Sequence, residues 1–176
     1  MILPIKTYGQ EVLRQRAVPV TEFDGELAQL AKNMAETMYS APGIGLAAPQ
    51  VGQGKRLIVV DVSHQDTRDR LHTVVNPEVE AISIETDRLE EGCLSIPGVY
   101  EPVVRPVWIR LKGQDLQGQD LVIEAEGLLA RCFLHEIDHL EGVLFVDRLM
   151  SFRGRLVRQR LKKLFGSLSL PALPIR

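Results

Sequence analysis

The chain has 176 residues, which suits one domain built around one hydrophobic core. Charged residues make up 25% of it and the formal net charge is −2, so a protein that binds DNA through overall positive charge is disfavoured. No apolar run approaches the roughly 20 residues that span a bilayer, and the first residues lack a secretory pattern, so we expect no membrane partner. With only two cysteines, Cys93 and Cys132, reduced thiols in the cytoplasm are favoured over a disulfide scaffold.

The first predicted element is a helix that Asp24 can cap. Apolar residues follow at helical spacing, namely Leu27, Leu30, Ala31, Met34 and Met38. Pro42 and Gly43 are expected to end this helix, and residues 43–54, rich in Gly, Pro and Ala, to form a loop. Strands are then predicted over 57–60, 73–75, 79–84, 107–112 and 121–125, with a hairpin turn over 115–119.

A second long helix is predicted from about Gly127 to Glu141, and Gly142 suits the left-handed position just past a helix end. A third helix is predicted over residues 151–166, and two prolines make the last residues unsuited to a helix. Strands that pair mostly with nearby strands, together with few helices, favour an α+β fold. We expect antiparallel or mixed β-sheets around the second helix, which should be buried, with a helix at the C-terminus.

The second predicted helix carries the stretch His-Glu-Ile-Asp-His over residues 135–139. Residues four apart project from one face of a helix, so His135 and His139 can share one ion, and imidazole suits zinc, iron, cobalt or nickel. Glu136 lies beside that ion, where a general base belongs. The helix is apolar around most of its circumference, and buried histidines beside buried carboxylates are costly without an ion or other partners. The alternative is a chance occurrence of this pattern on an exposed helix.

A catalytic metal site keeps three protein ligands and an open position. Both cysteines are candidates for the third ligand. Cys132 shares the helical face of the histidines, but it lies roughly 7 Å along the axis from their midpoint, which favours a packed core thiol. Cys93 follows Gly92, which lets the backbone approach a site closely. The spacing alone leaves the role of Cys93 open.

Residues 43–50 read Gly-Ile-Gly-Leu-Ala-Ala-Pro-Gln and are mostly small. Small residues bring backbone groups within reach of an extended ligand, and the amide of Gln50 can stabilise an oxyanion. A phosphate-binding loop is disfavoured, because no Gly-Lys-Ser/Thr follows. An ordinary surface loop is the alternative.

Together, three segments resemble the motifs of the peptide deformylase family. These motifs are Gly-φ-Gly-φ-Ala-Ala-x-Gln, Glu-Gly-Cys-φ-Ser and Gln-His-Glu-x-Asp-His, where φ is apolar, and they occur in this order over residues 43–50, 91–95 and 134–139. The resemblance covers nearly the whole chain and implies a single catalytic domain over residues 1–176. It also implies the reaction, which is removal of the formyl group from the N-terminal formylmethionine of newly made proteins, with release of formate.

The resemblance implies roles for individual residues. Cys93, His135 and His139 match the family's metal ligands, which commonly hold Fe²⁺ that Zn²⁺, Ni²⁺ or Co²⁺ can replace, and Glu136 matches its general acid/base. The other matches are the oxyanion donors Gln50 and the backbone N–H of Leu94, the peptide-contacting residues Gly45 and Gly92, and the methionine-pocket residues Ile44, Leu89, Leu128 and Cys132.

Two positions depart from the family pattern. Leu134 replaces the Gln before the first histidine, which is expected to change packing rather than chemistry. Arg131 occupies a position that can be apolar, and its charge is expected either to point to solvent or to alter the rim of the methionine pocket. Asp138 is expected to orient a ligand or an arginine such as Arg105, with a plain salt bridge as the alternative.

The predicted C-terminal helix carries six positive charges in eleven residues, on Arg153, Arg155, Arg158, Arg160, Lys162 and Lys163. One interpretation is a solvated helix that packs by one face. The other is docking to ribosomal RNA near the peptide exit, as in relatives with a basic C-terminal helix, which would be strongly salt dependent.

Two rival functions remain at this point. The first is a zinc endopeptidase of the His-Glu-x-x-His type, which would not need Cys93. The second is a non-catalytic metal-binding module associated with the ribosome, for which four protein ligands would be expected.

Overall fold

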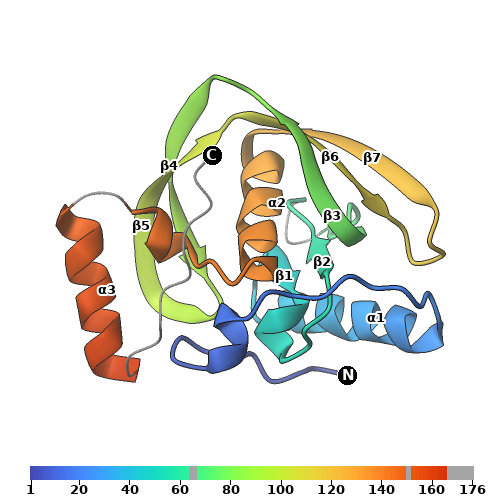
Figure 1. The fold of residues 1–176 in the computed structure, drawn as a ribbon, viewed down its shortest axis with the longest axis horizontal. Coiled ribbons are helices and arrows are strands. Elements are labelled where there is room, and N and C mark those ends of the chain that lie inside the picture. The colour runs from blue at the N-terminus through green and yellow to red at the C-terminus, as the bar shows by residue number, and fades with distance from the viewer. Residues whose placement is uncertain (64–66, 150–151, 166–176) are drawn as a thin grey trace.

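The computed structural model describes residues 1–63, 67–149 and 152–165 (Figure 1). The predicted ends of the third helix at Ser151 and Gly166, and the prediction for the last residues, lie outside this part of the chain. None of the described helices is long and apolar enough to cross a membrane.

Seven strands form two antiparallel sheets in the described chain. The five-stranded sheet has the order β1-β2-β3-β6-β7, and the other sheet is a ribbon of β4 and β5. The strands are β1 (Gly45–Ala47), β2 (Leu57–Val60), β3 (His72–Ile82), β4 (Thr86–Cys93), β5 (Ile96–Pro106), β6 (Trp108–Gln114) and β7 (Asp120–Glu126). The expected α+β fold is confirmed.

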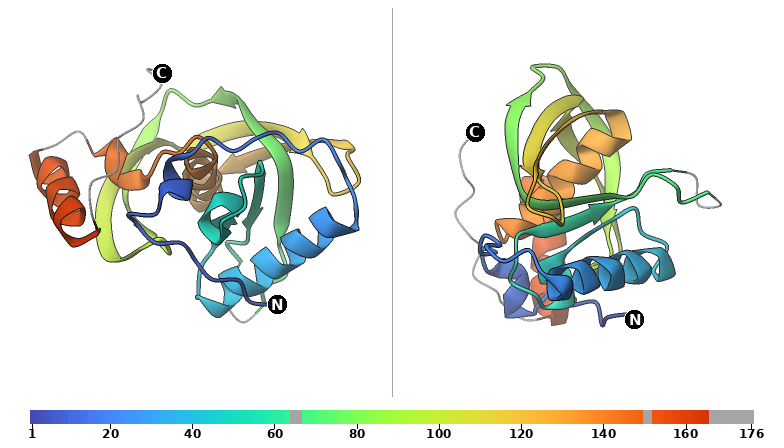
Figure 2. Two further views of the ribbon diagram at one scale, coloured as in Figure 1. Left: turned by 60° about the horizontal axis from the view of Figure 1, so that its bottom comes forward. Right: turned by 90° about the vertical axis from the view of Figure 1, so that its right-hand side faces the viewer.

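The helix α2 (Gly127–Leu140) stands in the middle of the molecule. The β4–β5 ribbon lies on one side of it and the five-stranded sheet on the other, while α1 (Gly25–Ser40) lies at the foot (Figure 1). Two further views show the same arrangement, with α3 (Phe152–Phe165) outside the ribbon (Figure 2). Short 3₁₀ turns cover Glu11–Arg14, Ala48–Val51 and Phe145–Arg148.

Three apolar clusters fill the spaces between these layers. One packs α2 against the large sheet around Phe133 and Leu140, and a second packs α1 against β1, β2 and β3 around Met34. The third joins the N-terminal segment, β5 and α3 around Phe145 and Leu161. The buried middle helix is therefore held by apolar contacts from the sheet, while its other side faces the ribbon.

The predicted cap of α1 and the predicted end of α2 agree with the structure. Asp24 caps α1, because its Oδ1 accepts the backbone N–H of Leu27 at 2.9 Å. Gly142 follows α2 with φ +72°, and a Cβ there would meet the carbonyl oxygen of Arg14 at 2.5 Å. Only glycine tolerates both demands at this position.

The ribbon strands β4 and β5 are absent from the sequence-based prediction. β4 is mostly polar, and β5 contains Pro97, Pro102 and Pro106, which normally argue against a strand. In a two-stranded ribbon each strand is also an edge, so prolines can occupy positions whose N–H makes no ladder hydrogen bond. Polar strands that pair only with each other leave little trace in the pattern of hydrophobic residues.

Two predicted strands, 73–75 and 79–84, form the single strand β3, which ends at Ile82. Asn76 interrupts its register with φ +51° and pairs with the backbone of Val20 through its side chain. The following Pro77 cannot donate a ladder hydrogen bond. The prediction of a loop over residues 43–54 was also partly wrong. Residues 45–47 form β1 at the edge of the large sheet.

Replacing the capping carboxylate, as Asp24→Ala, should destabilise the protein by about 1 kcal/mol, since one backbone N–H of α1 loses its acceptor. Urea unfolding followed by circular dichroism measures this change. Glu22→Ala, a neighbouring exposed carboxylate, is the matched control. Equal stability of the two variants would contradict the cap.

Candidate metal centre

Three side chains from two elements converge beside α2. The Sγ of Cys93, at the end of β4, and a ring nitrogen of each of His135 and His139 all lie within 4.8 Å of one another. Cys93 Sγ is 3.2 Å from Nε2 of His139. This is the only such group of three His, Cys, Asp or Glu side chains among the described residues. The structure therefore brings together the three residues that the motifs nominate.

Glu91 and Phe145 fix the orientation of the His135 ring. Its Nδ1 is 3.0 Å from Oε2 of Glu91, and the ring of Phe145 stacks against it with centroids 5.9 Å apart. With Nδ1 engaged, Nε2 is the nitrogen free to face an ion, which is the usual arrangement of a ligating histidine. Burial alone would lower the pKa of His135, but its contacts with Cys93 and Glu91 outweigh burial and raise the pKa well above its usual value. The surroundings thus favour a positive charge at this point.

His139 has the opposite tendency. Burial, followed by the nearby His135 and Arg105, lowers the pKa of His139 well below its usual value, so the ring is neutral. Neutral imidazole is the form that binds a metal ion. A thiol and two imidazoles, of which one is held neutral and one is oriented by a carboxylate, form a donor set that fits a divalent ion such as zinc or iron.

Glu136 lies next to this group, and only 3% of it is exposed. Burial raises its pKa to about 7, and its Oε2 has no hydrogen-bond partner among the described residues. A buried carboxyl group with a pKa near neutrality can both take up and release a proton under ordinary conditions. The unpartnered oxygen leaves one acceptor site open to a small molecule.

Gln50 is held with its amide nitrogen toward the cysteine. Its Oε1 accepts the N–H of Ala47 at 2.8 Å, which sets the direction of the amide group. Its Nε2 donates to Oγ of Ser95 at 3.1 Å and lies 3.5 Å from Sγ of Cys93. Gln50 therefore presents a fixed N–H donor at the edge of the three-residue group.

The second cysteine is not part of the group. Cys132 is 5% exposed, packs in the cluster between α2 and the sheet, and donates to the carbonyl oxygen of Ile44 at 3.4 Å. Burial raises the pKa of its thiol well above the usual value, so it stays protonated. This agrees with the interpretation of Cys132 as a packed thiol.

A pocket of about 410 Å³ opens in front of these residues. Most of the residues nominated from the sequence line it: Ile44, Gly45, Gln50, Gly92, Cys93, Leu94, Leu128, Cys132, His135 and Glu136. Leu89, nearly half exposed on β4, is not among the lining residues. Leu134 lies away from the pocket and packs at the edge of the cluster around Phe133.

The structure corrects one expectation about Arg131. Its side chain does not point to solvent, because only 3% of the residue is exposed. It lines the pocket and pairs with Glu91 and Asp87. The alternative expectation, that its charge alters the pocket, is compatible with this position.

Buried charges behind the pocket were only partly foreseen. Asp138 accepts from Nη1 of Arg105 at 2.7 Å and also pairs with Arg148, which confirms the expected contact with Arg105. Glu91 has its pKa lowered, because hydrogen bonds from His135 and Arg105 outweigh the effect of burial. The contacts of Glu91 with Arg105, Arg131 and His135 were not predicted, since Glu91 and Arg105 lie on two strands that the sequence does not predict.

Gly45 lies where any larger side chain would disturb the site. A Cβ there would collide with Oε1 of Glu136 and meet Sγ of Cys132 at 2.7 Å. Gly45→Ala should destabilise the protein by about 1–3 kcal/mol through overpacking, measured by urea unfolding. Gly54→Ala is the matched control, since nothing lies within 4 Å of its added Cβ. Equal stability of both variants would show that the site can move to accept the methyl group.

Comparison with known proteins places this geometry in a family. Residues 2–154 match the family model of polypeptide deformylase. A peptide deformylase from Cellvibrio japonicus is 46% identical over 162 residues, which is 92% of this chain and 95% of that protein. One from Thermodesulfovibrio yellowstonii is 47% identical over 161 residues, or 92% of this chain and 97% of the other.

Solved structures agree with the sequence comparison. The peptide deformylase of Legionella pneumophila matches with a TM-score of 0.84 and 42% identity, covering 93% of this chain and 95% of that one. The enzyme from Synechococcus elongatus matches with a TM-score of 0.83 and 45% identity, covering 92% of this chain and 85% of its own. The chain belongs to the polypeptide deformylase family.

Proposed function

We propose that the pocket bordered by Cys93, His135 and Glu136 is the place where this chain performs the reaction of its family. The chain is a metal-dependent hydrolase that removes the formyl group from the N-terminal formylmethionine of newly made proteins and releases formate. The observation that carries this location is the convergence of three ligand atoms within 4.8 Å beside a buried carboxylate and an open pocket.

Cys93, His135 and His139 would hold one divalent ion. We propose Fe²⁺, with Zn²⁺, Ni²⁺ or Co²⁺ able to replace it, because a thiolate with two imidazoles suits all four metals. Such an ion lowers the pKa of a water molecule that it binds and polarises a carbonyl group. A thiolate ligand also needs a reducing compartment, which supports the cytoplasm as the location.

Glu136 is proposed as the group that moves the proton. With a pKa of about 7 it accepts a proton from the attacking water and returns it to the departing amine nitrogen. Its carboxyl group lies in the pocket wall, and only 3% of the residue is exposed. The amine leaves as a free N-terminus and the formyl group leaves as formate.

Gln50 and the backbone N–H of Leu94 are proposed as donors to the formyl oxygen. Charge grows on this oxygen as water attacks, so a donor that is already oriented stabilises the transition state more than the substrate. The fixed orientation of the Gln50 amide, set by the N–H of Ala47, supports this role.

The rest of the pocket is proposed to hold the methionine side chain and the following peptide. Ile44, Leu128 and Cys132 would form the apolar wall, and the backbone of Gly45 and Gly92 would contact the peptide. A Cβ at Gly92 would meet the ring of Tyr100 at 2.5 Å, so glycine is required there for the present packing. We expect Leu89 to touch substrate only beyond the pocket.

Glu136→Gln should retain the bound metal and reduce formate release at least 100-fold, since the proton carrier is lost while the shape of the side chain is kept. The assay is formate release from formyl-Met-Ala-Ser by anaerobically purified protein, with the metal content measured in parallel. Glu124→Gln, an exposed carboxylate on β7, is the control. Normal turnover by Glu136→Gln with metal bound would remove Glu136 from the mechanism.

The two rival functions lose their support. The endopeptidase hypothesis gives Cys93 no role, so it does not explain why this thiol contacts His139. A closed structural site would use four protein ligands, whereas the group contains three among the described residues. We propose that residues 1–176 act as one catalytic domain with a basic C-terminal helix.

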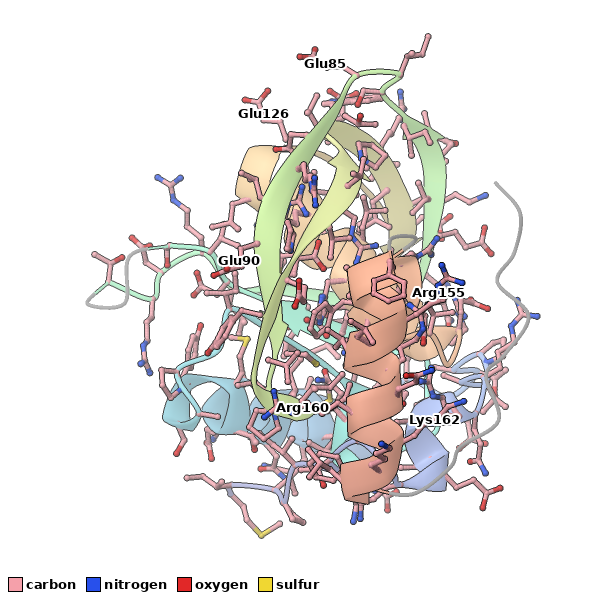
Figure 3. All side chains as sticks on the ribbon, turned by 90° about the vertical axis from the view of Figure 1, so that its left-hand side faces the viewer. Glu85, Glu90, Glu126, Arg155, Arg160 and Lys162 are labelled. Carbon is pink, nitrogen blue, oxygen red and sulfur yellow. The ribbon has the colours of Figure 1, made fainter. Side chains whose placement is uncertain are left out.

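The helix α3 is proposed as a contact with the ribosome, from which the formylated substrate emerges. Arg155 and Lys162 lie on one side of α3 and Arg160 on the other (Figure 3). Arg158 instead donates to the carbonyl oxygens of Val146 and Leu149, at 2.7 and 2.9 Å, so it fastens α3 to the body of the protein. The side chain of Arg153 lies outside those described.

Reversing Arg155, Arg160 and Lys163 together to Glu should reduce co-sedimentation with ribosomes several-fold at low salt, because fewer phosphates are neutralised. Formate release from a free tripeptide should be unchanged. Reversal of Lys32, Arg70 and Lys112, three exposed cations on other parts of the chain, is the control. Unchanged co-sedimentation of the α3 variant would support the solvated-helix interpretation instead.

A further inference from the structure

Arg131 is a buried arginine in the wall of the pocket, on the face of α2 that meets the ribbon. It is not one of the groups to which the proposed reaction gives a role. Its position is also one where an apolar side chain would fill the same space without a desolvation cost. The contacts of its guanidinium group show what the charge does there.

The guanidinium group of Arg131 joins α2 to both strands of the ribbon. Its Nη1 donates to Oε1 of Glu91 at 2.7 Å and to the carbonyl oxygen of Val103 at 2.9 Å. Its Nη2 pairs with the carboxylate of Asp87 and lies 3.3 Å from the carbonyl oxygen of the same residue. Glu91 and Asp87 belong to β4, and Val103 belongs to β5.

A second arginine, on the ribbon, reaches a carboxylate on α2. Arg105, on β5, donates to Glu91 through Nε at 2.9 Å and Nη2 at 3.0 Å, and its Nη1 reaches Asp138 on α2 at 2.7 Å. Glu91 therefore receives two arginines and Nδ1 of His135. Glu91, two residues before Cys93 on β4, is therefore the group on the ribbon that contacts both His135 and Arg131 of α2.

Overall stability is a weak reason for Arg131 to be present. Its Nε is buried without a hydrogen-bond partner among the described residues, and a buried ion pair often contributes less than apolar packing of the same volume. Removing the guanidinium would leave no buried carboxylate alone, since Glu91 keeps Arg105 and Asp87 is one-third exposed. The fold can therefore tolerate its loss, while α2 loses the contacts of this side chain with Glu91, Val103 and Asp87 on the ribbon.

We propose that Arg131 is a positioning residue that sets the distance between Cys93 and His135 by holding the ribbon against α2 through Glu91. The inference rests on the proposed function, because it assumes that these two residues bind the ion. Arg131 touches neither ion nor reacting atoms in this scheme. Its effect reaches the site only through Glu91 and the path of β4.

The test measures cobalt affinity with Arg131→Met, which keeps the apolar volume and removes the donors. Co²⁺ binding is followed by the charge-transfer absorption of the cobalt–thiolate bond in the apo-protein, together with kcat, KM and urea unfolding. The dissociation constant for Co²⁺ should rise about 10- to 100-fold, as for other groups that orient a ligating histidine. Arg110→Met, which removes a half-exposed arginine paired with Glu80 on the large sheet, is the matched control and should bind Co²⁺ normally.

A double-mutant cycle with Glu91→Gln tests the route of the effect. If Arg131 acts through Glu91, Arg131→Met should weaken Co²⁺ binding much less in the Glu91→Gln background than alone. Independent, multiplying losses would overturn the inference. Should Arg131→Met fail to fold, Arg131→Lys makes the same measurement, because it keeps the charge and loses the forked geometry, and an unchanged Co²⁺ affinity there also overturns it.

The outcomes separate this inference from the proposed function. No cobalt–thiolate absorption in the unaltered chain would overturn the metal site and, with it, the role of Arg131. Tight binding by the unaltered chain, with equal affinity in folded Arg131→Met, would overturn only the role of Arg131.

Discussion

The site depends on one buried carboxylate, that of Glu91. Two of the three converging side chains lie on α2 and the third lies at the end of the ribbon, so no single element sets their spacing. Glu91 is on the ribbon and contacts His135 on the helix, while two arginines neutralise its charge. A charge buried in this way is tolerated only when its partners are complete, which makes the relative position of helix and ribbon specific rather than adjustable.

The buried histidines and carboxylates of the site differ in their pKa values because their surroundings differ. The contacts of His135 with Cys93 and Glu91 raise the pKa of its ring. Burial, followed by the nearby His135 and Arg105, instead lowers the pKa of His139 and keeps that ring neutral. Glu136, with no such neighbour bonded to Oε2, has its pKa raised to about 7. Two carboxylates on adjacent elements thus differ in their protonation because one is paired and the other is only buried.

Much of the middle of the molecule can be predicted from the sequence. The spacing of apolar residues and the capping residues predict α1 and α2, and the His-Glu-x-x-His pattern places two ligands and a carboxylate on one helix. The ribbon is the part that could not be predicted, since its polar residues and three prolines do not follow the alternation of a half-buried strand. The third ligand, Cys93, is the residue that this ribbon carries, which is why spacing alone left it open.

The sequence by itself determined the chemistry that is available: two imidazoles four residues apart, a carboxylate between them, a glycine-rich segment with one amide, and a cysteine after a glycine. Only the tertiary structure decided how these groups meet, because the contacts of Cys93 with His139, of Glu91 with His135 and of Gln50 with Cys93 each join residues more than 40 positions apart. It also decided the place of Arg131, whose charge is buried in the pocket wall instead of exposed. Local patterns report which face of an element is apolar, whereas the partner of a buried charge depends on how the elements pack.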